Sequence, residues 1–169
     1  MLVRISILCC LSLLSSCGGE QYSARSTSEK FYEQNCTPFP LSVNWQQALT
    51  TNCNRLSDYG LFTDTTDPTQ NPRSPGLKCQ LATELFTDYA QKFRFIFIPP
   101  EEKASYTEVS AFDFPLGSML VKTFVVPNSN NQASEFDKIE TRLLIRRGNS
   151  WVGLPYIWNQ DKTEAYLVY

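Results

Sequence analysis

The sequence predicts a mainly β protein: an antiparallel sheet or sandwich domain with minor helix, preceded by an export signal and a flexible tether. Short runs of aromatic and β-branched residues, separated by turn-forming residues, recur in the second half of the chain. Hydrophobic residues make up 42% of the chain and aromatic residues 13%, which is enough to fill a core. We expect the signal at residues 1–16, the tether at 17–30 and one β-rich domain at 31–169.

The N-terminus has the order of a secretory signal. Arg4 supplies one positive charge, and the residues from 5 to 14 are mostly apolar. This run is too short to span a bilayer and fits the apolar part of a signal peptide. The following segment, Leu14-Ser15-Ser16-Cys17, resembles the lipobox of bacterial lipoproteins. That resemblance implies cleavage before Cys17 and attachment of diacylglycerol to its thiol. The alternative is an ordinary signal peptide that happens to contain this cysteine.

The tether follows the predicted lipidation site. Residues 17–30 are polar and rich in Gly, Ser, Thr and Gln, a composition typical of flexible linkers. Gly18, rather than aspartate, follows Cys17. By analogy with lipoprotein sorting in bacteria that have two membranes, this favours the outer membrane. We therefore expect a lipid-anchored protein on the extracytoplasmic side of a bacterial envelope.

The cysteines indicate a disulfide in the N-terminal part of the domain. Cys9 and Cys10 would leave with the signal, so three thiols remain in an oxidising compartment, namely Cys36, Cys53 and Cys79. Spacing allows either Cys36–Cys53 or Cys53–Cys79. We expect Cys36–Cys53, because it would staple the proline-containing segment before the sheet begins. Metal binding by three scattered thiols is the weaker alternative.

The remaining elements are expected in a simple order. Residues 43–49 favour a short helix, residues 63–76 a surface loop rich in Asp, Asn and Pro, and residues 82–91 one or two helical turns. Strands are predicted at 93–98, 119–126, 139–147, 151–158 and 165–169. Pro and Gly/Asn turn signals lie between them, which favours antiparallel pairing.

Charge and composition exclude several classes of function. The formal net charge is −2, so the chain offers no basic field for nucleic acid. There is no histidine, which excludes Ser-His-Asp catalysis, histidine-based zinc sites and Cys-x-x-Cys-His haem attachment. Glycine-rich phosphate-binding signatures are missing too. We expect no metal or other cofactor, and a non-catalytic domain rather than an enzyme.

Several segments together resemble a known family. They are DYGLF at 58–62, LFTDYAQKFRFIFIP at 85–99, FPLGSMLVKTF at 114–124, IETRLLI at 139–145, WVGLPYIWN at 151–159 and TEA at 163–165. In this order they resemble the N-terminal domain of a family of bacterial exported proteins and lipoproteins, commonly followed by c-type cytochrome sequence. The resemblance implies association with a separate cytochrome or another envelope protein. Haem-attachment runs are missing here, so it does not imply a cytochrome.

Charged residues on the predicted strands form a candidate polar cleft. A period of two places Glu140, Arg142, Leu144 and Arg146 on one strand face, which is too charged for a core. The cleft interpretation adds residues on or beside neighbouring strands, namely Asp88, Arg94, Lys122, Trp158 and Asn159. The alternative, which we favour, is a solvated sheet face with cross-strand ion pairs.

Two of these residues also have local interpretations. Asp88 and Lys92 have the i, i+4 spacing of a helical ion pair. Lys122 lies among apolar residues, so we expect its amine either to reach solvent along the sheet or to meet a carboxylate such as Glu140.

A second hypothesis is a carbohydrate-associated domain or a hydrolase. Trp151, Tyr156 and Trp158, with Asn159 at the strand end, suggest an aromatic sugar platform, although strand aromatics more often belong to a core. Glu140 and Glu164 are candidates for the carboxylate pair of a glycosidase. The first hypothesis remains a membrane-anchored lipoprotein with a non-catalytic binding or scaffold domain, associated with a redox system.

Overall fold

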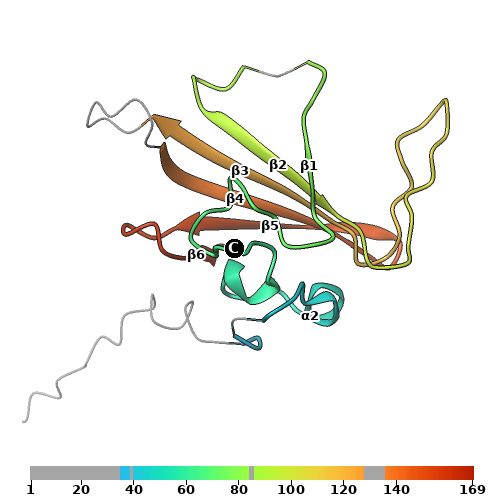
Figure 1. The fold of residues 1–169 in the computed structure, drawn as a ribbon, viewed down its shortest axis with the longest axis horizontal. Helices are drawn as coiled ribbons and strands as arrows, with labels where there is room; N and C mark the ends of the chain where they lie inside the picture. Colours follow the sequence, from blue (N-terminus) through green and yellow to red (C-terminus); the bar gives the residue numbers. More distant parts are fainter. Residues whose placement is uncertain (1–34, 39, 84–85, 128–135) are drawn as a thin grey trace, which may run out of the picture.

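The structure, a computed structural model, describes residues 35–38, 40–83, 86–127 and 136–169. In these residues six strands form one antiparallel sheet in which each strand pairs with the next along the chain (Figure 1). The predicted mainly β architecture with minor helix is therefore confirmed. The strands are β1 (Leu77–Cys79), β2 (Gln91–Phe97), β3 (Met119–Pro127), β4 (Phe136–Arg147), β5 (Ser150–Trp158) and β6 (Ala165–Leu167).

The predictions of a signal, a tether and lipid attachment at Cys17 lie outside the described residues. None of the helices in the described part of the chain is long and apolar enough to cross a membrane.

Alternation along the strands gives the sheet two unlike faces. In β3 every second side chain is buried, from Met119 to Val125, and the side chains between them are only partly buried. Thr141, Leu143 and Ile145 continue the buried side on β4. We call this side the covered face and the opposite side the open face. Because the period of a strand is two, the covered face takes most of the apolar residues and the open face receives the charges.

The covered face is packed against the chain that precedes the sheet. This chain contains the helix α2 (Trp45–Thr50), which contacts β4, and the 3-10 turn η1 (Leu56–Tyr59), which contacts β6 (Figure 1). Edge-to-face contacts join the two layers: ring centroids are 5.2 Å apart for Phe62 and Phe95, and 6.3 Å apart for Tyr59 and Tyr156. Such contacts add to the stabilisation from apolar burial.

Polar contacts also fix this cover to the sheet. The guanidinium of Arg147 on β4 donates to the carbonyls of Ala48 and Thr51 at the end of α2, over 2.6 and 2.8 Å. Glu164, just before β6, accepts hydrogen bonds from the backbone and hydroxyl of Ser57 in η1. Terminal helix carbonyls need partners from outside the helix, and Arg147 supplies them.

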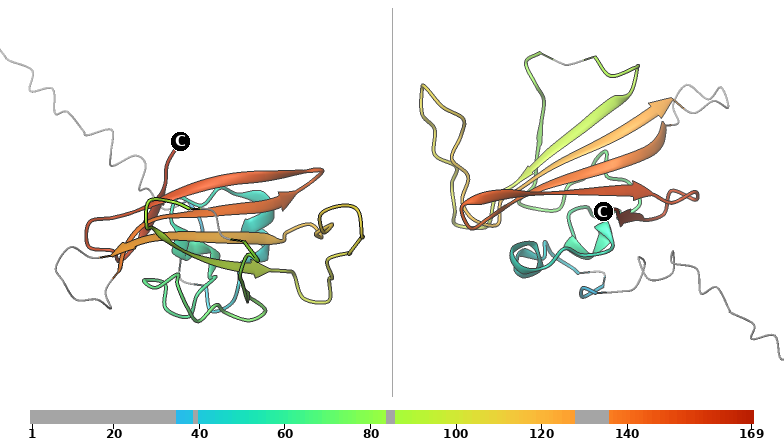
Figure 2. Two further views of the ribbon diagram at one scale, coloured as in Figure 1. Left: turned by 90° about the horizontal axis from the view of Figure 1, so that it is seen from above. Right: turned by 180° about the vertical axis from the view of Figure 1, so that it is seen from behind.

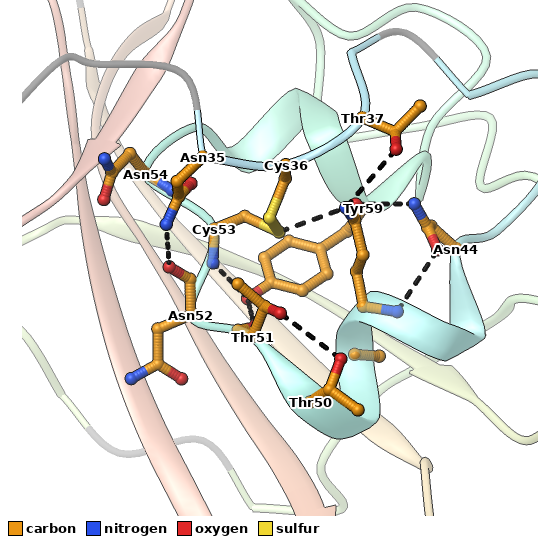
Figure 3. Close-up of a disulfide and its surroundings, with 12 residues drawn as sticks. Asn35, Cys36, Thr37, Asn44, Thr50, Thr51, Asn52, Cys53, Asn54 and Tyr59 are labelled. Atoms are coloured by element: carbon orange, nitrogen blue, oxygen red, sulfur yellow. Dashed lines mark hydrogen bonds between the residues drawn. A yellow bond between two sulfur atoms is a disulfide. The ribbon is translucent and has the colours of Figure 1, made fainter.

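The predicted Cys36–Cys53 disulfide is confirmed, and Cys79 is free. Its sulfur atoms are 2.08 Å apart, and the bond ties the start of the described chain to the segment after α2 (Figure 3). The Tyr59 hydroxyl accepts from the Cys53 amide at 3.0 Å and donates to the Thr51 carbonyl at 3.0 Å. The cover is thus held by a covalent link and by buried hydrogen bonds at the same place.

Three details differ from the sequence prediction. The strand β1 was not expected, because Leu77–Cys79 is too short to give a periodic signal. The helix expected at 43–49 begins two residues later, after Asn44, whose side chain accepts from the Gln47 amide as an N-cap.

The helical turns expected at 82–91 are wrong. The described residues there form bends and a turn, and Asp88 and Tyr89 have φ values of 39° and 62°. The expected helical pair of Asp88 and Lys92 is lost with them, because Lys92 belongs to β2 and pairs with Phe124 of β3.

Candidate ligand-binding face

The open face carries a hollow of about 780 Å³ over the middle of the sheet. Its floor comes from β2, β3, β4 and β5, and its wall includes Leu81 and Phe114 from the connections on either side of β2. The connection 98–118, drawn in yellow, projects beyond the strand ends in all three views (Figures 1 and 2). Since no described segment covers this face as α2 and η1 cover the other, it is the candidate site.

Strand register places cations beside one another on the open face. Lys122 of β3 lies opposite Arg94 of β2 on one side and Arg142 of β4 on the other. We call these three residues the cationic row. Adjacent strands are about 4.8 Å apart, so the row spans about 10 Å across the strands.

A row of apolar residues lies next to the cationic row. Leu120 of β3 faces Ile96 of β2 and Leu144 of β4, and Leu144 in turn faces Gly153 of β5. These four residues form the apolar row, which lies about 7 Å further along the strands. Leu144 is 43% exposed despite its central position. The hollow therefore has a charged side and an apolar side.

Glu140 neutralises one end of the cationic row. Its carboxylate oxygens accept from Arg142 Nε at 2.6 Å and Nη2 at 2.9 Å, a two-point ion pair. These hydrogen bonds are the main reason why the pKa of Arg142 is raised above its ordinary value. The Phe124 ring lies beneath both cations, 5.0 Å from Arg142 Cζ and 4.6 Å from Lys122 Nζ. Arg142 is thus held in place by its partners.

The side chain of Lys122 has fewer polar contacts than that of Arg142. Within the described chain its amine has the Phe124 ring as a contact, but neither a hydrogen bond nor an ion pair. Burial lowers its pKa, and the charges of Arg94, Arg142 and Lys92 lower it further, against a weaker opposing effect of Glu140. An anion placed between Arg94 and Arg142 would reverse that electrostatic penalty.

Phe114 lines the hollow and contacts two further aromatic residues, Trp151 and Phe112. Phe114 stacks edge-on against Trp151 of β5, with ring centroids 5.7 Å apart, and lies 6.2 Å from Phe112. Both Phe112 and Trp151 remain more than one-third exposed. Apolar surface therefore continues from the hollow onto these two residues.

The structure brings together only part of the predicted cleft. Arg94, Lys122, Glu140 and Arg142 share the open face, as the period of two on β4 indicated. The other predicted members lie elsewhere. Asp88 is exposed in the β1–β2 connection, and Asn159 accepts from the Thr163 amide in the β5–β6 turn.

Trp158, the remaining predicted cleft residue, belongs to the core of the covered face. It is 4% exposed, and its indole nitrogen donates to Thr141 Oγ1 over 3.0 Å. Tyr156 is fully buried on the same face, whereas Trp151 has the parity of Gly153 on β5 and therefore lies on the open face. The three aromatics therefore do not make one platform.

The proposed carboxylate pair is not brought together either. Glu140 holds Arg142 on the open face, and Glu164 holds Ser57 of η1 beside the covered face. The contacts of these two residues give the glycosidase hypothesis no support. Among the described residues no group of three or more acids and cysteines is arranged to hold a metal ion.

Sequence reasoning missed the apolar half of the hollow. Leu120, Leu144 and Gly153 were assigned to strands, but the register that places them in one row depends on pairing between strands. Phe114 reaches the hollow only because of the path of a long connection. The signal available was the 119–126 segment, whose residues are apolar on both faces of the strand apart from Lys122 and Thr123.

Comparison of the chain with protein-family models, with curated proteins and with solved structures finds no match. The resemblance to cytochrome-associated exported proteins therefore stays a prediction, and the face has to be interpreted from its own geometry.

Proposed function

We propose that the protein is a lipid-anchored lipoprotein of the bacterial envelope whose non-catalytic domain binds a ligand on the open face of its sheet. The observation that carries the proposal is the hollow of about 780 Å³, with cations on one side and uncovered apolar side chains on the other. An antiparallel sheet commonly leaves a polar face to water. A concave apolar surface with a few convergent polar groups is instead typical of a binding site.

The chemistry of the face favours binding over catalysis. Glu140 is the carboxylate that lines the hollow, and both of its oxygens are occupied by Arg142. A general base needs a lone pair directed at the substrate, and a nucleophile needs such a base beside it. Arg94, Lys122 and Arg142 offer hydrogen-bond donors and positive charge, which orient an anion without transferring a proton.

Anchoring is supported by the order of the N-terminal sequence. A charged start, an apolar run, the Leu14–Cys17 motif and a polar segment follow one another as in lipoproteins. Gly18 favours the outer membrane, and the segment resemblance favours a separate c-type cytochrome or another envelope protein as a neighbour. On this proposal the tether holds the domain at the membrane surface while the open face remains accessible.

A photo-crosslinking experiment tests whether the open face is occupied in the cell. The apolar photoreactive residue p-benzoylphenylalanine replaces Leu144 in the hollow or, as a control, the exposed Gln160 of the β5–β6 turn. Irradiated envelopes are then analysed by mass spectrometry of the intact protein. We expect an adduct from position 144 and none from position 160. Equal labelling at both positions, or none at either, would contradict the proposed function.

A further inference from the structure

We propose that the ligand of the open face is an anionic amphiphile, with its hydrocarbon chain on the apolar row and its acidic head group in the cationic row. This inference rests on the proposed function and specifies the chemistry of the ligand. It follows from three features of the hollow: the order of its rows, its charge and its depth.

The order of the rows matches the order of groups in such a molecule. Lys122 and Leu120 are two residues apart on β3 and point to the same side of the sheet. Arg142 and Leu144 repeat that order on β4, and Arg94 and Ile96 repeat it on β2. Charged and apolar groups are therefore separated by about 7 Å, along three neighbouring strands. A head group on the cationic row places an attached chain directly over the apolar row.

The charge around Lys122 favours an anion. Among the residues that line the hollow, Arg94, Lys122 and Arg142 are positive, and Glu140, which is paired with Arg142, is negative. Lys122 lies between two cations without an ion pair in the described chain. A carboxylate or phosphate would meet guanidinium and ammonium donors from both sides, which gives strong charge-assisted hydrogen bonds.

The depth of the hollow leaves room for a chain. Gly153 ends the apolar row without a side chain, and a Cβ placed there would lie 3.5 Å from Leu144 Cδ2, an ordinary contact. A Cβ at position 153 therefore fits without straining the strand, and a longer side chain there would extend toward the hollow that Gly153 lines. Phe114 and Trp151 continue the apolar surface beyond that point. The apolar row and its continuation thus offer a surface for a hydrocarbon chain.

Binding is tested with the full-length protein in phosphatidylcholine nanodiscs. The probe is cis-parinarate, a fluorescent long-chain carboxylate that accepts energy from tryptophan, and empty nanodiscs give the background. Competitors share a twelve-carbon chain: dodecanoate, dodecyl phosphate, dodecanol and dodecyltrimethylammonium, with acetate as the anion without a chain. We expect the first two to displace the probe and the last three to fail. The ratio of the displacement affinities of dodecanoate and dodecyl phosphate distinguishes a carboxylate ligand from a phosphate ligand. Displacement by the alcohol or the ammonium compound as strong as by dodecanoate would overturn the proposal.

Two variants locate the site. Lys122→Gln is expected to weaken probe binding at least about tenfold, since it removes a charge-assisted contact. Gly153→Leu is expected to weaken it to a similar degree by occupying the chain position. Their controls are Lys103→Gln, an exposed lysine of the 98–118 connection, and Gln160→Leu, an exposed turn residue. Circular dichroism establishes whether each variant is folded. If Gly153→Leu does not fold, Lys122→Gln alone tests the location of the site.

The outcomes separate the two proposals. Unchanged affinity in folded Lys122→Gln would overturn the amphiphile proposal. A protein adduct at position 144, together with no binding of the probe above background, would overturn it while leaving the proposed function intact. An adduct whose mass is that of a fatty acid or an acyl phosphate would support both.

Discussion

Removing the Cys36–Cys53 disulfide is expected to lower the free energy of unfolding by about 3 kcal/mol. The two cysteines are 17 residues apart, so the bond closes a short loop in the unfolded chain. Entropy of loop closure for a loop of this length corresponds to about 10 cal/mol/K, which gives the expected value at room temperature.

The loss should be concentrated in the first described residues. The Cys53 backbone keeps two partners without the disulfide, because its amide donates to Tyr59 and its carbonyl accepts from Tyr156 at 2.7 Å. Cys36 lies at the other end of the bond, in a segment tied to the cover by Asn35, which bonds the backbone of Asn52 and Asn54. We therefore expect the strand region to keep its structure while the start of the chain detaches.

Urea unfolding of the full-length chain, followed by tryptophan fluorescence, measures the change. Oxidised wild type is compared with wild type under reducing agent and with Cys36→Ala/Cys53→Ala. Reduction should lower the unfolding free energy of the wild type to about that of the double variant. The unfolding free energy of the double variant itself should not change on reduction. Cys79→Ser is the control, because Cys79 is outside the disulfide.

Hydrogen exchange then shows which part of the chain responds. Amides near residues 35–38 and 43–50 should lose protection in the double variant, and amides of β3 and β4 should keep theirs. A change in unfolding free energy below about 1 kcal/mol would refute the loop-entropy argument. Loss of protection spread evenly over the sheet would refute the view that the effect is local.

Four further predictions test other parts of the structure. Gly60→Ala should destabilise the protein by about 3 kcal/mol in urea unfolding, because Gly60 has φ +65° and a Cβ would lie 2.4 Å from a backbone oxygen, whereas Gly153→Ala should change little. Thr141→Val should cost about 2 kcal/mol by leaving buried donors without their acceptor, and a neutral result would contradict the buried network. The pKa of Lys122 is lowered by burial and by nearby cations, so the unfolded chain binds its proton more tightly. The stability of the wild type relative to Lys122→Gln should therefore rise as the pH increases toward about 10.4, and a constant difference between pH 7 and pH 10 would refute this. Cys17→Ser should release the protein from membranes without changing its melting temperature, and a variant still found wholly in the membrane fraction would argue against lipidation.

The sequence was sufficient to predict five of the six described strands, but not their register. The period of two on residues 139–147 already separated Glu140 and Arg142 from Leu143 and Ile145, and the structure keeps that separation. It did not show that Lys122 would face Arg142 while Glu140 faced Phe124. Register depends on turns and on a β-bulge after Phe124, which have no simple signature in one sequence.

The errors have physical causes of the same kind. The helical turns predicted near Asp88 do not form, because strand pairing competes with them: β2 begins at Gln91, which pairs with Val125. Trp158 was given a role in a cleft, but its parity on β5 places it with Tyr156 in the core. The hollow itself needs Phe114, which comes from a long connection whose path follows from tertiary contacts rather than local sequence.

The sequential order of the strands also bears on how the protein acquires its structure. From β1 to β6 each strand pairs with its chain neighbour, so the sheet grows through short-range hairpins, which form quickly. The N-terminal cover is the exception. Its contacts with Tyr156 and Glu164 span 103 and 107 residues along the chain. A chain that emerges N-terminus first therefore presents α2 and η1 before their docking surface exists. During that interval the apolar side chains of the cover have no native partner and are exposed to non-native contacts.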